Sequence, residues 1–358
     1  CPQKKLKENR EKGIECSCRQ FPVKEQLKRW KEIFKSKPGA FTLRIKTDMQ
    51  NPNPAFRDRV LFRISDTEHP RVGKKYKVWP LLEFSWAIDD ILLKMTHIIR
   101  GKDLMMESEM EKYIWDIFGW KGPEIIYTGL IRIIGDKISK SKSQQEVKSG
   151  KFIGWQDPRT WSVSSLRKRG FLPEAIKEFV KELGLNQNDI VVPIDILYSI
   201  NRKIIDKKTD RYSFVQDPVK LNIKKMPEIK SVELKIHPDK KIKRKVILGK
   251  NIFIPSQDYE KHKNSEVRLM HLFNIKIKDN YESDFTSSEN KDIQKLQWVS
   301  DFVNTRILMP NGEWVNGIAE SAIKKLKPEE VIQFERFGFC KFDKINEAGE
   351  FEFWYTHG

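Results

Sequence analysis

Residues 96–134, THIIRGKDLMMESEMEKYIWDIFGWKGPEIIYTGLIRII, decide the fold class of the first part of the chain. Residues 96–99 predict a short buried strand, and residues 124–134 predict a longer one. Between them, residues 108–118 have the apolar spacing of a helix, which Gly119 ends. A strand, a helix and a further strand in succession are typical of an α/β layer with a parallel sheet.

The segments before this stretch continue the same alternation. Residues 4–37 are polar and helix-prone, and Pro38-Gly39 ends that segment. Residues 40–46 alternate like a strand, and residues 74–82 predict another. Residues 84–93 then carry the apolar face of a helix.

The pattern changes towards the C-terminus. Residues 173–183 and 194–206 predict two helices, the first with Pro173 at its first position. From about residue 212 onward, apolar and polar residues alternate in short runs separated by turn signals such as Asn311-Gly312. Many short strands with such turns predict a β-barrel or sandwich region.

The composition excludes several classes of protein. The chain has 358 residues, which suggests two or three domains, and its 11% aromatic content is too high for a disordered chain. No apolar run approaches the roughly 20 residues of a membrane span, and no signal peptide opens the chain. We therefore expect a soluble intracellular protein. The 68 Lys and Arg against 50 Asp and Glu give a net charge of +18, which favours a polyanionic partner, nucleic acid first.

The positive charge is uneven. Residues 207–263 hold sixteen Lys and Arg against seven Asp and Glu, a net +9. Basic strands with aromatic neighbours such as Tyr212, Phe214 and Phe253 would suit a single-stranded RNA loop, whose bases stack on aromatic rings. The alternative is a solvated basic edge that discourages aggregation. The excess over the whole chain favours RNA.

Four cysteines in 358 residues are too few for a disulfide framework, so a reducing compartment is expected. Cys16-Ser-Cys18 could bind a soft cation such as zinc through two thiolates, with Cys1 as a third ligand. Three reduced thiols near a chain end are the alternative, and the residues alone leave both interpretations open.

Residues 137–141, KISKS, follow the second predicted strand and a Gly-Asp turn. Flexible lysines on such a loop can reach phosphate oxygens and stabilise the charge of a departing pyrophosphate. Alone, five residues in a Lys- and Ser-rich chain are a weak signal, and a solvated loop fits them better. The segments that follow in the sequence strengthen the first interpretation.

These segments resemble a known family. KISKS resembles the class I signature Lys-Met-Ser-Lys-Ser, with Ile138 for Met, and residues 155–159, WQDPR, resemble Trp-Asp-Asp-Pro-Arg, with Gln156 as a departure. Further matches occur in family order: 197–206 (LYSINRKIID), 214–221 (FVQDPVKL), 266–269 (EVRL) and 331–339 (VIQFERFGF). Along its whole length the chain is similar to class I glutamyl-tRNA synthetases of the archaeal and eukaryotic type, relatives of glutaminyl-tRNA synthetases.

The resemblance implies a multidomain protein of α/β, α and β parts. Residues 1–135 would be the second part of a Rossmann-type catalytic domain with its acceptor-end insertion and a Cys-rich knuckle. Residues 136–211 would hold the signature loop and a helical stem-contact region, and residues 212–358 two anticodon-binding β-barrels.

The implied activity is that of a cytoplasmic glutamate–tRNA ligase. Such an enzyme uses ATP and Mg²⁺ to form a glutamyl adenylate and passes the glutamyl group to tRNA(Glu). The alternatives are a non-catalytic tRNA-binding module and an enzyme that also charges tRNA(Gln).

The resemblance also assigns residues to the reaction. Lys140, with Ser139 and Lys137, would stabilise the ATP phosphates. Arg100 would face the side-chain carboxylate of glutamate, which a guanidinium binds through two hydrogen bonds. Leu82 and Trp86 fall where relatives place pocket side chains. The alternatives are a structural ion pair for Arg100 and core positions for Leu82 and Trp86.

Five residues are implied as tRNA contacts. Gln333, Glu335 and Arg336 match the glutaminyl-type strand that reads anticodon bases, Arg244 matches a basic anticodon contact, and Arg159 belongs to the WQDPR motif. The alternatives are ordinary exposed polar positions of a barrel strand and a solvated charge.

One departure concerns the first half of the nucleotide-binding fold. No His-Ile-Gly-His-type motif occurs in the chain, and Cys1-Pro2 resembles the second member of the family's first Cys-x-Cys pair. We therefore expect that the N-terminal catalytic half is missing from this chain and that the isolated chain is inactive. Cys1, Cys16 and Cys18 would then bind zinc in the complete protein, with the missing ligand upstream of Cys1.

Overall fold

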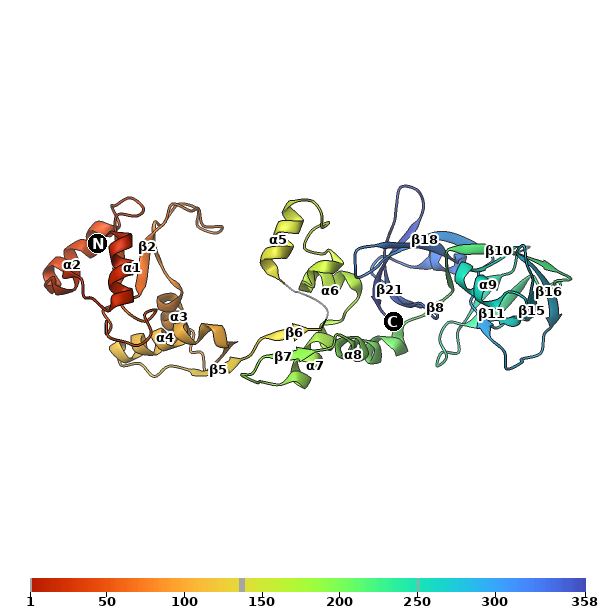
Figure 1. The fold of residues 1–358 in the computed structure, drawn as a ribbon, viewed down its shortest axis with the longest axis horizontal. Helices are drawn as coiled ribbons and strands as arrows, with labels where there is room; N and C mark the ends of the chain where they lie inside the picture. The colour runs from red at the N-terminus through yellow and green to blue at the C-terminus, as the bar shows by residue number, and fades with distance from the viewer. Residues whose placement is uncertain (1, 135–138, 250) are drawn as a thin grey trace. The chain divides into compact units, whose positions relative to one another are not determined.

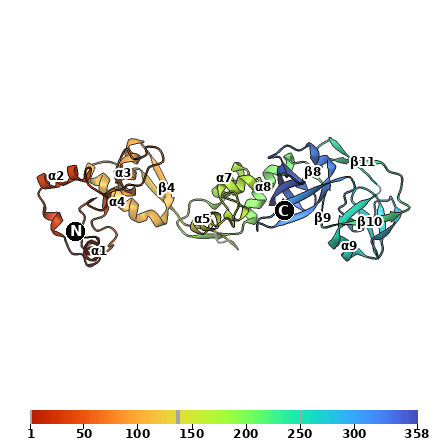
Figure 2. The same ribbon diagram turned by 90° about the horizontal axis from the view of Figure 1, so that it is seen from above.

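The computed structural model describes residues 2–134, 139–249 and 251–358, and the structural statements below concern these residues (Figures 1 and 2). The chain divides into two compact units. Unit 1 comprises Cys1–Ile131 and Leu185–Ile190, and unit 2 comprises Arg132–Gly184 and Val191–Gly358.

Unit 1 combines helices, a small antiparallel sheet and a pair of parallel strands. Its elements in chain order are α1 (Gln3–Lys12), η1 (Ser17–Gln20), α2 (Val23–Ile33), β1 (Thr42–Arg44), β2 (Val60–Ile64), β3 (Val78–Pro80), α3 (Leu82–Leu92), β4 (His97–Gly101), η2 (Lys102–Leu104), α4 (Met105–Phe118) and β5 (Glu124–Thr128). Strands β1, β2 and β3 form the antiparallel sheet. Strands β4 and β5 run parallel, from the pairing of His97 with Glu124 to that of Gly101 with Thr128. The predicted strand–helix–strand unit is therefore present.

Helices α3 and α4 pack against one another and against β4. The indole Nε1 of Trp115 on α4 donates a 2.8 Å hydrogen bond to the carbonyl of Ala87 on α3. Both residues are buried in a core that also contains Leu61, Met110 and Ile114. This contact fixes the two helices whose polar side chains surround the end of β4.

Three predicted elements of unit 1 have other bounds. The helix expected over residues 4–37 is broken into α1 and α2, and Gly13 ends α1 in a left-handed conformation with φ 69°. The strand expected over 74–82 is confined to β3. The strand expected over 124–134 ends at Thr128, because the next N–H, that of Gly129, donates to Asn186 O at 2.7 Å. The two backbones are so close here that a Cβ at position 129 would overlap the Asn188 carbonyl. The chain resumes as β6 (Ile131–Ile133), which pairs with β7 (Ile190–Val192).

The helical part of unit 2 packs on the last strand of the chain. Its helices are α5 (Lys140–Lys148), η3 (Pro158–Thr160), α6 (Val163–Arg169), α7 (Pro173–Leu183), α8 (Asp195–Ile205) and η4 (Asp206–Lys208). The buried Arg169 donates to the carbonyls of Tyr355 and Thr356 at 3.2 and 2.8 Å. Asn201 on α8 accepts from the Leu172 N–H and lies 3.0 Å from His357 Nε2. These bonds tie α6 and α8 to the C-terminal strand.

The remainder of unit 2 is mostly β-structure with two large cores. One sheet has the order β8 (Arg211–Tyr212), β20 (Val331–Phe334), β21 (Gly338–Ile345), β22 (Phe351–His357), β18 (Phe302–Leu308), β19 (Trp314–Glu320) and β9 (Phe214–Gln216). The other has the order β13 (Ile252–Pro255), β10 (Pro218–Lys224), β16 (Glu282–Ser287), β15 (Asn274–Ile277), β14 (Glu266–Leu269) and β17 (Lys295–Leu296). A ribbon of β11 (Ser231–Lys235) and β12 (Lys243–Ile247), the helix α9 (Ser256–His262) and the turn η5 (Ser321–Lys325) complete the unit. Each sheet encloses its own apolar cluster, so the predicted all-β region is confirmed in its general form.

One predicted strand of this region is interrupted. The alternation over residues 331–342 is divided into β20 and β21 by a tight turn in which Arg336 takes φ 64°.

Among the helices of the described ranges, none has the length and apolar character needed to span a membrane.

Candidate functional site

Arg100 lies on β4 and points to the sheet face that α3 and α4 cover. Its Nη1 donates to Glu111 Oε1 at 2.6 Å and its Nη2 to Glu111 Oε2 at 3.2 Å. Nη1 also donates to Ser108 Oγ at 3.1 Å. The guanidinium lies 4.9 Å from the ring centroid of Trp86 on α3, and only 8% of the side chain is exposed. Strand β4 and both helices therefore hold this cation in one orientation.

The surroundings of Arg100 contain more carboxyl groups than cations. Asp90 on α3 lies 3.9 Å from Arg100 Nη2. Burial raises the pKa of Glu111 and the pKa of Asp90, and the neighbouring Arg100 opposes the increase in both. Near them, Arg59 pairs with Glu83 and, at 2.8 Å, with Glu107. The carboxyl groups of these four residues, Glu111, Asp90, Glu83 and Glu107, thus share the guanidinium groups of Arg100 and Arg59.

The structure brings together two of the three residues predicted for the amino-acid pocket, Arg100 and Trp86. The third, Leu82, is the first residue of α3 and is 51% exposed. The structural ion pair, which was the alternative for Arg100, is also present. Its partner Glu111 was missed, although Ser108 and Glu111 are spaced i,i+3 on one face of the predicted helix.

The KISKS motif is only partly within the described residues, because Lys137 lies outside them. Ser139 is the N-cap of α5, and its Oγ accepts a 3.4 Å hydrogen bond from Lys142 N. Lys140 is the first residue of this helix and is exposed. A helix N-terminus with lysines beside it is suited to phosphate groups, because its N–H groups and dipole favour negative charge.

Arg159 is bound within its own loop. Its Nε and Nη2 donate to the two carboxylate oxygens of Asp157, both at 2.8 Å, and Nη2 also donates to Lys151 O at 3.1 Å. Burial raises the pKa of Asp157, but the hydrogen bonds from Arg159 and from Ile153 N outweigh burial and leave the pKa below its usual value. The WQDPR motif is therefore a structured loop. Its predicted contact with tRNA remains a prediction.

Gln333, Glu335 and Arg336 lie together on β20 and in the turn that follows it. Gln333 pairs with Arg211 of β8, and the Glu335 N–H donates to Tyr212 O at 3.0 Å. Gln333 Oε1 is buried, and no hydrogen-bond donor of the described residues reaches it. Arg336 is exposed and donates to Lys295 O. A buried acceptor that has no donor among the described residues is an exception in folded proteins, and a water molecule or another bound group would satisfy it.

Arg244 is buried, unlike a solvated or surface-binding cation. Its Nε donates to Glu320 Oε1 at 2.6 Å, its Nη2 to Glu320 Oε2 at 3.2 Å and its Nη1 to Lys235 O at 2.7 Å. The guanidinium also lies 5.6 Å from the ring of Tyr212, whose pKa burial raises to about 12. The alternative of a solvated charge is wrong, and an RNA contact would require this pair to open. The geometry favours a structural role that joins β12 to β19.

The described residues do not form a zinc site. Cys1 lies outside them, and among the residues they include no group of three metal-binding side chains is present. Cys16 Sγ accepts a 3.1 Å hydrogen bond from Arg44 Nη2. Burial raises the pKa of Cys16, but the bonds from Arg44 and Cys18 outweigh it and lower the pKa overall. Cys16 and Cys18 supply two thiols towards a tetrahedral zinc ion, and the predicted site, whose ligand Cys1 lies outside the described residues, remains a prediction.

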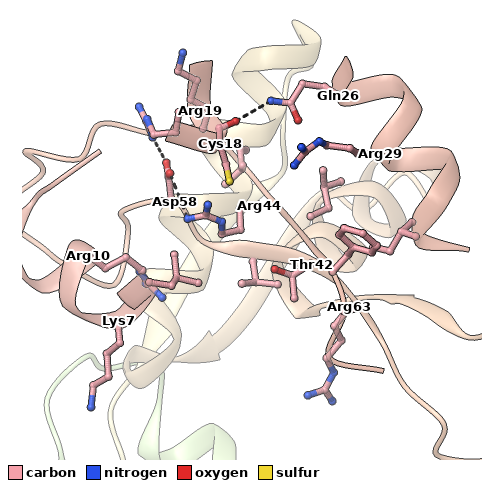
Figure 3. Close-up of a pocket in the computed structure, with 18 of the residues that line it drawn as sticks. Lys7, Arg10, Cys18, Arg19, Gln26, Arg29, Thr42, Arg44, Asp58 and Arg63 are labelled. Atoms are coloured by element: carbon pink, nitrogen blue, oxygen red, sulfur yellow. Dashed lines mark hydrogen bonds and ion pairs between the residues drawn. The ribbon is translucent and has the colours of Figure 1, made fainter. Parts of the chain in front are cut away.

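A basic groove that sequence analysis missed lies in unit 1 (Figure 3). Its volume is about 1180 Å³. Its cationic lining residues are Lys4, Lys7, Arg10, Arg19, Arg29, Arg44, Lys46 and Arg63, and its acidic ones are Glu11 and Asp58. Phe21, Trp30 and Phe41 add aromatic rings. Lys4, Lys7 and Arg10 lie in one basic run on α1, whereas the other cations come from segments as far along the chain as Arg63, so the sequence alone does not show that they meet.

The positive charge of the groove is only partly neutralised. Asp58 is shared by Arg19 and, at 3.6 Å, by Arg44. Burial lowers the pKa of Arg10, and the charges of Arg59 and Arg44 lower it further. In the described parts of the chain, Arg63 has no ion-pair partner. The groove therefore offers cations and aromatic faces to a polyanion.

Comparison with known proteins identifies the class. Residues 1–207 match the family described as tRNA synthetases class I (E and Q), catalytic domain. Residues 209–295 and 271–343 match two anticodon-binding domain families of the same synthetases. The chain belongs to the class I (E and Q) tRNA synthetases.

Curated relatives that the chain matches include archaeal glutamate–tRNA ligases. The chain is 38% identical to a glutamate–tRNA ligase of Methanocaldococcus jannaschii over 100% of its own length and 66% of the relative's. It is 39% identical to the glutamate–tRNA ligase of Pyrococcus horikoshii, over 96% of the chain and 64% of the relative. A solved glutamate-tRNA synthetase from Elizabethkingia anophelis matches 55% of the chain and 44% of its own, with a TM-score of 0.33 and 19% identity. The chain spans slightly less than two thirds of the length of these curated relatives.

Proposed function

We propose that this chain is the greater part of a glutamate–tRNA ligase, which attaches glutamate to tRNA(Glu) in the cytoplasm. The observation that carries the proposal is Arg100, a buried guanidinium stacked on Trp86 in a chain that matches archaeal glutamate–tRNA ligases along its whole length. A guanidinium suits the side-chain carboxylate of glutamate, whereas a neutral amide leaves its donors poorly paired.

The reaction needs positioning and charge stabilisation. Glutamate attacks the α-phosphate of ATP, pyrophosphate leaves, and a terminal ribose hydroxyl of the tRNA then takes the glutamyl group from the adenylate. Lys140 and the capped N-terminus of α5 would stabilise the phosphates. Mg²⁺ would accompany the nucleotide and neutralise its phosphate charge.

The tRNA would contact both units. Gln333 and Arg336 would meet the anticodon in the β-region, which we assign to two anticodon-binding barrels over residues 212–358. Residues 136–211 would contact the stem of the tRNA. The basic groove within residues 1–135 would hold the phosphate backbone of the acceptor strand. The net charge of +18 supports such a division of a large polyanion over the chain.

A further part of the catalytic domain would complete unit 1. Ile98 and Arg100 face α3 and α4, so Ile99 faces the opposite side of the sheet, where it is 60% exposed. Parallel sheets are normally covered on both faces. The N-terminal catalytic half, with its His-Ile-Gly-His-type motif, would cover this face.

Two measurements test the proposal. The isolated chain should bind tRNA in a filter-binding assay but form no glutamyl-tRNA, and measurable glutamyl-tRNA from it would contradict the missing half. In the full-length protein, Arg100→Ala should impair the use of glutamate and leave tRNA affinity within about twofold, whereas Arg100→Lys should retain part of the activity. Equal losses with glutamate and glutamine would refute the assigned role of Arg100.

A further inference from the structure

A group of aromatic side chains lies on the hairpin formed by β2 and β3. The loop of residues 65–77 joins the two strands and projects from the sheet (Figure 1). The ring of His69 in this loop stacks on the ring of Trp79 on β3, with the centroids 5.0 Å apart and the planes 14° apart. Tyr76 contacts the same indole edge-on at 6.1 Å, and 51% of Tyr76 is exposed. None of the three belongs to the apolar core that holds α3 and α4 together, so that core does not explain their position.

The same loop carries positive charge that no carboxylate neutralises. Its cationic side chains are all exposed: Arg71, Lys74, Lys75 and Lys77. Among the described residues, none of these four has an ion-pair partner. The loop contains only two acidic side chains, Asp66 and Glu68, so four cations against two anions leave it with a net charge of +2. Aromatic rings beside unpaired cations are suited to single-stranded nucleic acid, because the bases stack on the rings and the cations attract the phosphates.

The hairpin adjoins the two sites described above. Trp79 pairs with Arg63 across β2 and β3, so their side chains are neighbours on one side of the sheet, and Arg63 lines the basic groove. Shortly after Trp79, helix α3 begins at Leu82 and carries Trp86, which contacts Arg100. Along the chain, Trp79 therefore stands between a residue of the groove and the helix of the proposed glutamate site.

We propose that His69, Tyr76 and Trp79 form a stacking platform for the unpaired 3′-terminal nucleotides of tRNA, with the cations of the loop at their phosphates. In a paired stem the base faces are covered by neighbouring base pairs, so these rings act only beyond the last base pair. The 3′ end has to reach the glutamyl adenylate, and the platform stands on the strand that leads into α3. This inference rests on the proposed function as a glutamate–tRNA ligase and adds to it the binding residues for the end of the tRNA.

Binding of intact and trimmed tRNA by the full-length protein tests the platform. The trimmed tRNA ends at the last base pair of the acceptor stem. Since one base–aromatic stack changes affinity by about five- to 150-fold, the unsubstituted protein should bind trimmed tRNA at least about fivefold more weakly in a filter-binding assay. Trp79→Ala should reduce this difference to less than about twofold, whereas Trp79→Phe, which keeps a ring, should retain most of it. Phe118→Ala is the matched control, because Phe118 is also an exposed ring of unit 1 in a stacked pair, 4.4 Å from Trp120, and it should leave the difference unchanged.

Equal binding of the two RNAs by the unsubstituted protein overturns the inference. A Trp79→Ala protein that loses affinity equally for both RNAs, or that still distinguishes them fully, also overturns it. Tyr76→Ala, at an exposed position outside the strands, repeats the test if Trp79→Ala fails to fold, and it should bind intact tRNA more weakly while its affinity for trimmed tRNA is unchanged. A full-length protein that distinguishes the two RNAs as expected but forms no glutamyl-tRNA refutes the proposed function and not the platform.

Discussion

Replacing Arg244 by alanine separates a structural role from a role in RNA binding. The change removes two hydrogen bonds to Glu320, one to Lys235 O and the contact with the Tyr212 ring. It leaves the Glu320 carboxylate, 2% exposed, with the 2.9 Å bond from Ser213 N as its remaining partner. Breaking one side of a buried ion pair costs about 3–5 kcal/mol, because the other charge stays buried without compensation.

Urea unfolding followed by tryptophan fluorescence measures this cost. With a denaturant slope of about 2–3 kcal/mol/M, the loss lowers the unfolding midpoint by about 1–2.5 M. Lys245→Ala, at an exposed position of the same strand, is the control and should change stability by less than about 0.5 kcal/mol. Adding Glu320→Ala to Arg244→Ala should recover part of the stability, because the unpaired charge is then removed.

One result would contradict the structural role of Arg244. An Arg244→Ala protein that unfolds at the same urea concentration as the unsubstituted protein, but binds tRNA more weakly, would show that the ion pair is open in solution. Arg244 would then be the direct RNA contact that the sequence resemblance implies.

Three further predictions follow from the described contacts. Burial lowers the pKa of His357 to about 4, so as pH falls the imidazole is protonated in the unfolded chain before it is protonated in the folded one. The free energy of unfolding should therefore decrease by about 3 kcal/mol between pH 6.5 and pH 4. Thermal unfolding of His357→Gln should lack that loss. Arg63→Ala should weaken tRNA binding and reduce the slope of log affinity against log salt concentration by about 0.9. The control is Lys31→Ala, at a position of α2 outside the groove, which should leave the slope unchanged. Equal slopes for the two variants would refute the groove as a phosphate site. Gly129→Ala should destabilise unit 1 by about 1–3 kcal/mol or more in urea unfolding, because its Cβ meets the Asn188 carbonyl, and an unchanged midpoint would contradict this packing.

Most helices and the class of the β-region could be predicted because their signals are local. Gly119 ends α4 with φ 64°, and Pro173 stands at the first position of α7, as its sequence context predicts. Alternating residues over 212–358 predict strands for the same reason. The break of the long strand at Gly129 could not be foreseen, because its cause is the backbone of residues 186–188, almost sixty positions away.

The contacts within the candidate site are even harder to predict from the sequence, because they join residues far apart in the chain. Arg100 and Trp86 were predicted, but Glu111, which binds Arg100 through both carboxylate oxygens, reaches it from a neighbouring helix. Glu320, the partner of Arg244, lies 76 positions away in a different sheet, and only the tertiary fold brings the two side chains together. The basic groove collects cations from distant segments of unit 1. Residue type and spacing predict which groups can do chemistry, whereas the partners that bind them depend on the tertiary structure.

Aminoacylation by the full-length protein tests the central claim most directly. The protein is incubated with ATP, Mg²⁺, tRNA and either labelled glutamate or labelled glutamine, and acid-precipitable label is counted. We predict ATP-dependent attachment of glutamate, with little or no attachment of glutamine, and loss of the glutamate signal in Arg100→Ala at unchanged tRNA affinity. A protein that binds tRNA but attaches no glutamate, or attaches glutamine as readily, would contradict the account.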